Sequence, residues 1–278
     1  MKKISRRSFL AAAAVSAAAL ALTACGGSAS TASSAASSVA ASSEAASTSA
    51  AAAELTTVEA GKLTMATNAA FPPYEMTTDA GAFEGIDIDT AQAIADKLGL
   101  ELQIDDMDFD AALLSVQQGK ADIAMAGVTV TDERKNVMDF SDSYATGIQS
   151  IIVPEGSDIA SPDDLAGKMI GTQRGTTGYI YCSDDFGDDA VVAYDDGLTA
   201  VQALNNGQVD AVVIDNAPAK EFVAANPGLV LLDTSYAEED YAIGMAKGNT
   251  ALEDAVNAAL EELKADGTLQ SIVDKYIT

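Results

Sequence analysis

The run Met125-Ala126-Gly127-Val128-Thr129-Val130-Thr131-Asp132-Glu133-Arg134 carries the chain from an apolar strand pattern into the start of a helix. Residues 122–125 predict a short buried strand, and Gly127 lets its backbone come close to another group. Thr131 is a favourable helix N-cap, and the two acidic residues after it suit the positive end of a helix dipole. Arg134 falls in the first helical turn, where a cation is unfavourable by about 0.3–1 kcal/mol.

This misplaced arginine indicates an anion-binding site. A guanidinium group is a planar fork that binds a carboxylate through two parallel hydrogen bonds. A glycine and threonine hydroxyls stand close to Arg134 in the sequence. A surface ion pair between Arg134 and Asp132 fits the same spacing, so the run by itself leaves both interpretations open.

Composition excludes several classes of function. The chain has 278 residues, 48% of them hydrophobic, and a formal net charge of −27. Such a charge argues against nucleic acid or anionic lipid as a partner. There is no histidine, which excludes Ser-His-Asp and Cys-His catalysis and histidine-ligated metal sites. We expect no cofactor and no metal, and the different contexts of Cys25 and Cys182 argue against a disulfide.

The N-terminus has the pattern of an export signal. Basic residues precede an apolar run at 9–24 that is too short to span a membrane, so residues 1–24 predict a signal peptide. Leu22-Thr23-Ala24-Cys25 resembles a bacterial lipobox, in which Cys25 would be lipidated and become the mature N-terminus. The pair Arg6-Arg7 fits either a twin-arginine signal or an ordinary basic start.

Residues 25–54 then predict a flexible tether. Alanine, serine and threonine dominate this segment, which lacks the large apolar side chains needed for a core. A flexible chain of this length has a root-mean-square extension of roughly 30 Å.

The folded part, from Leu55 onward, alternates strand and helix patterns. A strand at 63–67 is followed by a helix that Gly99 ends, a strand at 101–104, and a helix at 109–118. Ser161-Pro162-Asp163-Asp164 predicts a further helix start, and two amphipathic helices close the chain. This alternation predicts an α/β fold with largely parallel sheets.

A weak internal repeat indicates two similar lobes. The first copy is Leu113, Val116, Gly119 and Asp122, and the second is Val201, Leu204, Gly207 and Asp210. Each copy ends a helix at a glycine and enters an apolar strand, although generic helix-glycine-strand chemistry also gives this pattern. We take 150–153 and 241–246 as the strands that cross between the lobes. Lobe 1 is then 55–149 plus 240–278, and lobe 2 is 150–239.

Further candidate residues follow predicted strands, where ligands of open α/β sheets bind. Gly175-Thr176-Thr177-Gly178 either opens a helix whose amides hold a carboxylate or forms a simple turn. Asp215 either accepts an ammonium group or caps the next helix. Phe71 and Tyr74 flank a Pro-Pro turn and either wall a ligand or pack the core. The spacing around Asp106 imitates a calcium loop but lacks its required glycine and glutamate, so we reject calcium there.

Together these segments resemble the family of extracytoplasmic binding proteins that deliver polar amino acids to ABC transporters. Gly85-Ile86-Asp87-Ile88-Asp89 is similar to the family signature, although Thr90 replaces an aliphatic residue. Four other segments occur in the expected order: Phe71-Pro72-Pro73-Tyr74 with Asn68, Gly127-Val128-Thr129 with Arg134, Asp139-Phe140-Ser141-Asp142, and Gly175-Thr176-Thr177. The resemblance implies a two-lobed periplasmic-binding-protein-like α/β fold of type II with two hinge crossings.

The resemblance also implies a role for each site residue. Arg134 would bind the α-carboxylate of an amino acid, helped by Thr129 and by the hydroxyl and amide of Thr176. Asp215 would receive the α-ammonium group, with the Gly127 carbonyl assisting.

The remaining residues would contact the side chain of the ligand. Phe71 and Tyr74 would hold it, and Gln173 and Gln149 are candidates for reading its polar groups. Thr177 would be a ligand-binding residue on the second lobe. Asn68 stands where some members that bind basic amino acids carry an acid, which makes a cationic ligand less assured.

The function implied is that of the substrate-binding lipoprotein of an amino acid importer. The two lobes would close on a free amino acid, and the closed monomer would dock on a membrane permease that a cytoplasmic ATPase drives. Two alternatives remain: an extracytoplasmic dehydratase on the same fold, which the lack of histidine weakens, and a ligand-sensing module. We expect no signalling domain after Thr278.

Overall fold

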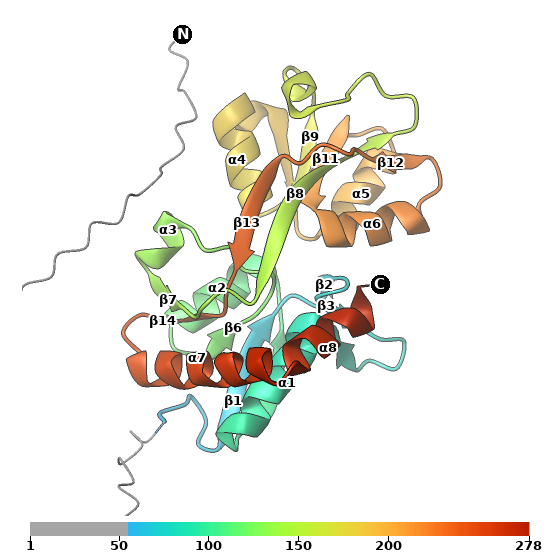
Figure 1. The fold of residues 1–278 in the computed structure, drawn as a ribbon. Coiled ribbons are helices and arrows are strands. Elements are labelled where there is room, and N and C mark those ends of the chain that lie inside the picture. The colour runs from blue at the N-terminus through green and yellow to red at the C-terminus, as the bar shows by residue number, and fades with distance from the viewer. Residues whose placement is uncertain (1–54, 278) are drawn as a thin grey trace, which may run out of the picture. The chain divides into compact units, whose positions relative to one another are not determined.

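Two β-sheets covered by helices form the two lobes. The structure is a computed structural model that describes residues 55–277. The predicted signal peptide, Cys25 and the tether therefore lie outside the described residues. Figure 1 shows the lobes joined by the neighbouring strands β8 (Ala145–Pro154) and β13 (Ala237–Tyr241).

The first lobe is built on a β-α-β-α-β run. This run comprises β1 (Lys62–Thr67), α1 (Ile86–Leu98), β5 (Glu101–Asp106), α2 (Phe109–Gln117) and β6 (Ile123–Ala124). The strand order of the sheet is β5-β1-β6-β14-β7, with β7 at Met138–Phe140 and β14 at Gly244–Ala246. The short helix α3 (Asp132–Lys135) joins β6 to β7. A small sheet of β2 (Ala70–Phe71), β3 (Glu75–Thr77) and β4 (Phe83–Glu84) precedes α1.

The second lobe repeats this plan. Its run comprises β9 (Ile170–Gln173), α4 (Thr177–Phe186), β10 (Val191–Tyr194), α5 (Gly197–Asn205) and β11 (Ala211–Asp215). A short 3₁₀ helix, η2 (Asp188–Ala190), precedes β10, and α6 (Asn216–Ala225) leads to β12 (Leu229–Leu231). The strand order is β10-β9-β11-β8-β12, with β13 paired to β8.

In both sheets the strands run in one direction apart from the strand that enters from the other lobe. β1 is parallel to β5 and β6, whereas β14 is antiparallel to β6 and β7. Likewise β9 is parallel to β10 and β11, whereas β8 is antiparallel to β11 and β12. The prediction of an α/β fold with largely parallel sheets is confirmed, with one reversed strand in each sheet.

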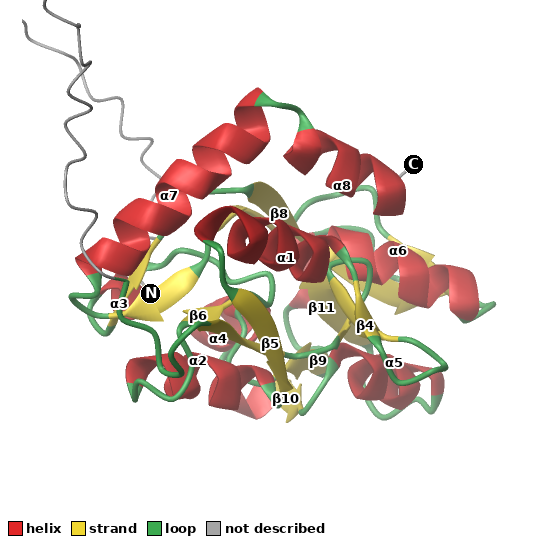
Figure 2. Ribbon diagram, turned by 90° about the horizontal axis from the view of Figure 1, so that it is seen from below, coloured by secondary structure: helices red, strands yellow, loops and turns green. Residues whose placement is uncertain are grey.

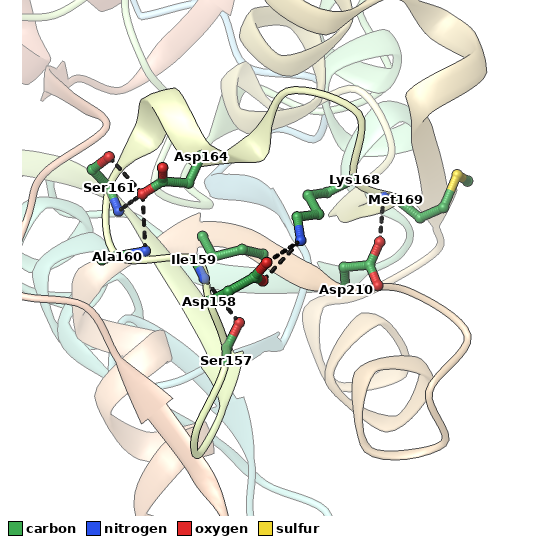
Figure 3. Close-up of polar contacts among 9 residues, drawn as sticks. All are labelled: Ser157, Asp158, Ile159, Ala160, Ser161, Asp164, Lys168, Met169 and Asp210. Atoms are coloured by element: carbon green, nitrogen blue, oxygen red, sulfur yellow. Dashed lines mark hydrogen bonds and ion pairs between the residues drawn. The ribbon is translucent and has the colours of Figure 1, made fainter.

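The aspartates of the internal repeat take equivalent places in the two lobes. The Asp122 carboxylate accepts a hydrogen bond from the Thr64 amide at 2.8 Å, which ties β6 to β1. The Asp210 carboxylate accepts one from the Met169 amide at 2.8 Å, which ties β11 to the start of β9 (Figure 3). The repeat therefore reflects one way of joining the third strand of each lobe to the first.

The predicted helix start at Ser161 is only a four-residue 3₁₀ helix, η1 (Pro162–Leu165). The Asp164 carboxylate accepts hydrogen bonds from the amides of Ala160 at 3.1 Å and Ser161 at 3.0 Å, as Figure 3 shows. Nearby, the ammonium group of Lys168 pairs with Asp158 at 2.8 Å. The capping signal was present, but β9 begins a few residues later and leaves no length for a helix.

The prediction of 150–153 and 241–246 as the crossing strands is largely wrong, because 150–153 pairs within the second lobe, and 241–246 meets the crossing only at Tyr241 before it continues as β14 of the first lobe. Residues Ala145 to Gln149 of β8 pair with β13, and the rest of β8 pairs with β11 and β12. The predicted lobe boundaries at 149/150 and 239/240 therefore fall inside β8 and β13. The crossing is a two-stranded antiparallel ribbon.

The C-terminal helices complete the first lobe. α7 (Thr250–Ala265) and α8 (Thr268–Tyr276) pack against α1, as Figure 2 shows from below. α7 buries Leu252, Val256 and Leu260, and each such burial stabilises the fold by roughly 1.5–3 kcal/mol. Within residues 55–277, no helix combines the length and the apolarity that crossing a membrane requires.

Candidate ligand-binding site

The candidate site lies where the carboxyl ends of β1, β6, β9 and β11 meet between the lobes. A cavity of about 20 Å³ there is lined by Asn68, Phe71, Glu75, Phe109, Ala126, Gly127, Thr129, Arg134, Gln173, Thr176, Thr177 and Asp215. Every residue predicted to contact the ligand is in this set except Tyr74 and Gln149. The Tyr74 ring stacks on Phe71 with a centroid distance of 5.8 Å and lines a neighbouring cavity.

Arg134 is buried, and its guanidinium group spans the two lobes. The Thr131 hydroxyl caps α3 by accepting a hydrogen bond from the Arg134 amide at 3.1 Å, as the sequence predicted. Arg134 Nη1 donates to the Thr129 carbonyl at 2.8 Å, and Nη2 donates to the Gly175 carbonyl at 3.0 Å. The Phe109 ring lies 5.3 Å from the guanidinium carbon. Among the described residues Arg134 forms no ion pair, so the alternative of a surface ion pair with Asp132 is wrong.

The two threonines at the start of α4 differ in what their hydroxyls do. The Thr176 hydroxyl caps the helix by accepting from the Tyr179 amide at 3.3 Å, and it donates to the Gln173 carbonyl at 2.8 Å. The Thr177 hydroxyl lies 3.4 Å from the Thr129 hydroxyl of the first lobe. Thr177 therefore faces the other lobe, whereas the Thr176 hydroxyl is used within its own.

Asp215 ends β11, and its side chain turns into the cleft. It stands at the N-cap of α6 but makes no capping hydrogen bond. Its carboxylate instead accepts from Gln149 Nε2 at 2.8 Å and from the Tyr241 hydroxyl. Burial raises the pKa of Asp215 to about 7, although the hydrogen bond from Tyr241 opposes this rise. Of the two interpretations left open by the sequence, helix capping is the wrong one.

Two further buried carboxyl groups stand at the cleft. Glu75 on β3 lines the cavity, and neither of its carboxyl oxygens has a hydrogen-bond partner among the described residues. Burial, and next the Asp87 carboxylate, raise the pKa of Glu75 well above its usual range. Glu239 on β13 accepts hydrogen bonds from the Thr129 hydroxyl at 3.0 Å and from Gln149 Nε2 at 3.1 Å.

Asp87, in the first turn of α1, holds the loop after β6 in place. Its carboxylate accepts hydrogen bonds from the Gly127 amide at 3.0 Å and from the Tyr144 hydroxyl at 2.8 Å. Burial raises the pKa of Asp87 to about 6, while these two hydrogen bonds act in the opposite direction. Asp87 therefore connects the family signature segment to the glycine loop and to the start of β8.

An amide pair closes another part of the cleft. Gln173 Nε2 of the second lobe donates to Asn68 Oδ1 of the first lobe at 2.9 Å. Asn68 Nδ2 in turn donates to the Met107 carbonyl at 3.0 Å. The structure thus brings together Asn68 and Gln173, both of which were predicted to contact the ligand.

Sequence reasoning missed Glu75, Phe109, Glu239 and Tyr241. Glu239 and Tyr241 share the buried face of β13, but the sequence Ala-Glu-Glu-Asp-Tyr does not alternate apolar and polar residues and gave no signal for this face. For Glu75 the signal was its place directly after the Pro-Pro-Tyr turn. Phe109 gave no local signal, because an aromatic residue that opens a helix is ordinary core.

The sequence pattern of the bacterial extracellular solute-binding proteins, family 3, matches residues 63–278. The chain belongs to this family. A curated relative, the L-cystine-binding protein TcyJ of Escherichia coli (strain K12), is 32% identical over 222 residues, which cover 78% of this chain and 83% of the relative. The putative ABC transporter arginine-binding protein 2 of the same strain is 31% identical over 227 residues, or 80% and 93% of the two chains.

Solved structures agree with this assignment. An ancestral arginine-binding protein bound to arginine is 42% identical, with a TM-score of 0.75 and coverage of 78% of this chain and 99% of that one. The arginine-, lysine-, histidine-binding protein ArtJ from Geobacillus stearothermophilus is 34% identical, with a TM-score of 0.74 and coverage of 78% and 95%. The two-lobed periplasmic-binding-protein fold is confirmed. So is the predicted class of function, a substrate-binding protein of a polar amino acid ABC transporter and not an enzyme.

Proposed function

We propose that this family 3 protein binds a free amino acid with a cationic side chain, of the arginine class, between its two lobes. The observation that carries the proposal is the surplus of buried carboxyl groups at the cleft. Arg134 is the buried cation there, whereas Glu75, Asp215 and Glu239 are all buried acids. The cleft therefore favours a ligand with more positive than negative groups.

The two ends of an amino acid account for only part of this charge. Arg134 is suited to the α-carboxylate, together with the Thr129 hydroxyl and the amides at the N-terminus of α4. Asp215 is suited to the α-ammonium group. Glu75 and Glu239 then have no partner on the backbone of the ligand. A guanidinium or ammonium group on the ligand side chain would neutralise their negative charge. Phe71 and Tyr74 would pack against the aliphatic part of that side chain.

The names of relatives support a ligand of this class. The putative ABC transporter arginine-binding protein 2 of Escherichia coli (strain K12) is one. The ancestral arginine-binding protein bound to arginine is another, at 42% identity.

A neutral amide side chain is the second candidate. The Asn68–Gln173 pair presents amide groups at the cleft, and Asn68 is uncharged where an acid would favour a cation. An ancestral arginine-binding protein bound to glutamine is 41% identical to this chain, with a TM-score of 0.75. Glutamine is therefore the ligand to test against arginine.

Ligand capture would proceed by hinge motion of the lobes, 55–149 plus 240–278 against 150–239. A cavity of about 20 Å³ holds about one water molecule, so an amino acid requires the lobes to move apart before it binds. A ligand that contacts Arg134 on one lobe and Asp215 on the other favours the closed state by its differential affinity. The closed form then docks on the permease of the importer.

The protein would be held at the membrane by a lipid on Cys25. The lipobox-like segment that ends at Cys25 and the tether of mainly alanine and serine at 26–54 support this proposal, and both lie outside the described residues. Mass spectrometry of the membrane fraction, with Cys25→Ser as the comparison, tests it.

The test of ligand class is calorimetric titration of the domain from Leu55 onward with L-arginine, L-lysine, L-glutamine and L-cystine. The protein is first unfolded and refolded to remove bound ligand. We expect arginine to bind most tightly. Glu75→Gln should weaken arginine binding by roughly 10- to 100-fold, because a hydrogen bond to a charged group contributes about 1.5–3 kcal/mol. Glutamine binding should change little.

The matched control is Glu84→Gln, which changes an exposed glutamate on the neighbouring strand β4. It should leave arginine binding unchanged. A wild-type protein that binds glutamine more tightly than arginine would establish the second candidate. Absence of binding by every amino acid in the panel would overturn the proposed function.

A further inference from the structure

Tyr241 is a fully buried residue of β13 at which both lobes and the hinge meet. Its ring lies over Gly147 of β8 so closely that a Cβ atom at Gly147 would be 2.4 Å from the ring. The rings of Tyr241 and Tyr74 of the first lobe pack edge to face, with centroids 5.4 Å apart and an interplanar angle of 74°. The Tyr241 hydroxyl donates a hydrogen bond to Asp215 of the second lobe.

We propose that Tyr241 is a positioning residue for the part of the cleft that binds the α-ammonium group. From its place in the hinge, its hydroxyl orients the Asp215 carboxylate. The inference rests on the proposed function, in which Asp215 receives the α-ammonium group. Tyr241 itself is absent from the set of residues that line the small cavity. It acts through Asp215 and not by touching the ligand.

The backbone around Tyr241 fixes the ring to the crossing ribbon. Tyr241 pairs with Ala145 in the antiparallel register, and its carbonyl accepts a hydrogen bond from the Tyr144 amide at 3.0 Å. It also forms an isolated bridge with Thr129, a residue of the cleft. The ribbon that joins the lobes therefore sets where the Tyr241 hydroxyl lies relative to Asp215.

The groups that face Asp215 come from several elements. The Tyr241 hydroxyl and the Gln149 amide donate to it, and Glu239 on the same ribbon repels it. Glu75 on β3 is a further acid nearby, and the Arg134 guanidinium on α3 and the Tyr74 hydroxyl complete the surroundings. Lys220 and Glu221 on α6 line the adjoining cavity of about 290 Å³, which Asp215 and Tyr241 also line.

The hydroxyl of Tyr241 favours the ionised form of Asp215. Its hydrogen bond lowers the pKa of Asp215, against the larger effect of burial that raises it to about 7. An ammonium ligand needs this carboxylate ionised. Loss of the hydroxyl should therefore raise the pH below which affinity for the ligand falls. A tyrosine with a purely structural role would not have this effect.

The experiment is calorimetric titration of L-arginine between pH 5.5 and 9 with wild type, Tyr241→Phe and Tyr276→Phe. Phenylalanine keeps the ring over Gly147 and removes only the hydroxyl. Tyr276 lines the same 290 Å³ cavity, but its hydroxyl donates to Asp89 at 3.0 Å, so it is a matched control. We expect the affinity ratio of wild type to Tyr241→Phe to be about tenfold larger at pH 6 than at pH 9, since one pKa unit is a factor of ten. Tyr276→Phe should follow wild type.

An affinity ratio for Tyr241→Phe that is the same at every pH would overturn the inference, and so would unchanged binding. A second measurement needs no ligand: carbon-13 NMR titration of the Asp215 carboxyl carbon. Its pKa should be higher in Tyr241→Phe than in wild type, and an equal or lower value would overturn the inference. Failure of wild type to bind arginine would count against the proposed function only.

If Tyr241→Phe does not fold, incorporation of 3-fluorotyrosine replaces that variant. Fluorine makes the hydroxyl a stronger donor and keeps the ring. The pKa of Asp215 should then fall, and an unchanged or higher value would contradict the role assigned to Tyr241.

Discussion

The guanidinium group of Arg134 is hydrogen-bonded to main-chain carbonyls and to no carboxylate of the described residues. Burial lowers the pKa of Arg134, with Glu239 acting in the opposite direction. A buried charge without an ion-pair partner is costly, and removal of one member of a buried pair typically costs about 3–5 kcal/mol. An anionic group of the ligand is the natural partner for this charge.

Arg134→Ala should therefore reduce amino acid affinity by at least about 100-fold, as truncation of a buried charge partner costs about 2–5 kcal/mol of binding. Calorimetry measures the loss, and circular dichroism checks that the variant is folded. Arg174→Ala is the control, because the Arg174 side chain is 55% exposed and its one ion pair among the described residues, with Asp195, is long at 3.7 Å. Normal binding by Arg134→Ala would show that the ligand lies elsewhere.

Residues with a local signal were found from the sequence, whereas those defined by distant partners were not. Arg134, Thr131 and Thr176 are recognisable because helix capping depends on neighbours within one turn. Glu75 and Tyr241 acquire their surroundings from segments far along the chain. Tyr241 contacts Asp215, and nothing near either residue in the sequence reveals that contact.

At the scale of the element, α1 shows how one turn of helix can organise a site. Its N-terminal turn carries Asp87 and Asp89, which are two positions apart and so point to different sides. Asp87 is fully buried, and it orients the Gly127 loop and Tyr144. Asp89 pairs with Lys275 on α8 at the surface, at 2.7 Å.

Asp87→Ala should destabilise the domain by about 2 kcal/mol more than Asp89→Ala. Loss of Asp87 leaves the Gly127 amide and the Tyr144 hydroxyl buried without a partner, at about 1–3 kcal/mol. Loss of a surface ion pair costs about 0–1 kcal/mol. Urea unfolding of both variants measures the difference. Equal destabilisation by the two would mean that the hydrogen bonds of Asp87 contribute no more than a surface pair.

Elements with clear helix-capping or helix-ending residues were predicted well. The helix at 86–98 ends at Gly99, which adopts the left-handed conformation that glycine favours there. The pairing of β8 with β13 was only partly foreseen, and the strands of the small β2–β3–β4 sheet were not predicted. The strands of the small sheet are only two or three residues long, and β13 is mostly charged and pairs with a strand far away in the chain, so periodicity alone does not identify them.

At the scale of the whole molecule, buried carboxyl groups should govern how stability depends on pH. The chain has no histidine, so no imidazole titrates between pH 5 and 8. Burial raises the pKa of Asp87 to about 6 and that of Asp215 to about 7. Exposed acids such as Asp158 have a lowered pKa, because of the Lys168 hydrogen bond, and titrate below this range.

The ligand-free domain should melt at a higher temperature at pH 5 than at pH 8. An acid whose pKa is raised in the folded state binds its proton more tightly when the domain is folded. Its contribution to the free energy of unfolding is therefore complete below the unfolded pKa near 4, and it is lost as the pH rises through about 6 for Asp87 and about 7 for Asp215. A loss of 1 kcal/mol lowers the melting temperature of a domain of this size by about 2–4 °C. Scanning calorimetry measures the shift.

Asp215→Asn provides the control for this prediction. Removal of one carboxyl group with a raised pKa should make the melting temperature less dependent on pH. A wild-type melting temperature that is constant or rises from pH 5 to pH 8 would contradict the assignment of these carboxyl groups.

The place of β14 has a consequence for how the protein is made. β14 (Gly244–Ala246) lies between β6 and β7, yet it follows the whole second lobe in the chain. The strands of the second sheet are all present once residue 241 has been synthesised. The first sheet is still divided at that point. The first lobe, although its synthesis begins earlier, is therefore the last to be completed. An export pathway that threads an unfolded chain would have to carry the chain as far as β14 across the membrane before the first lobe could fold.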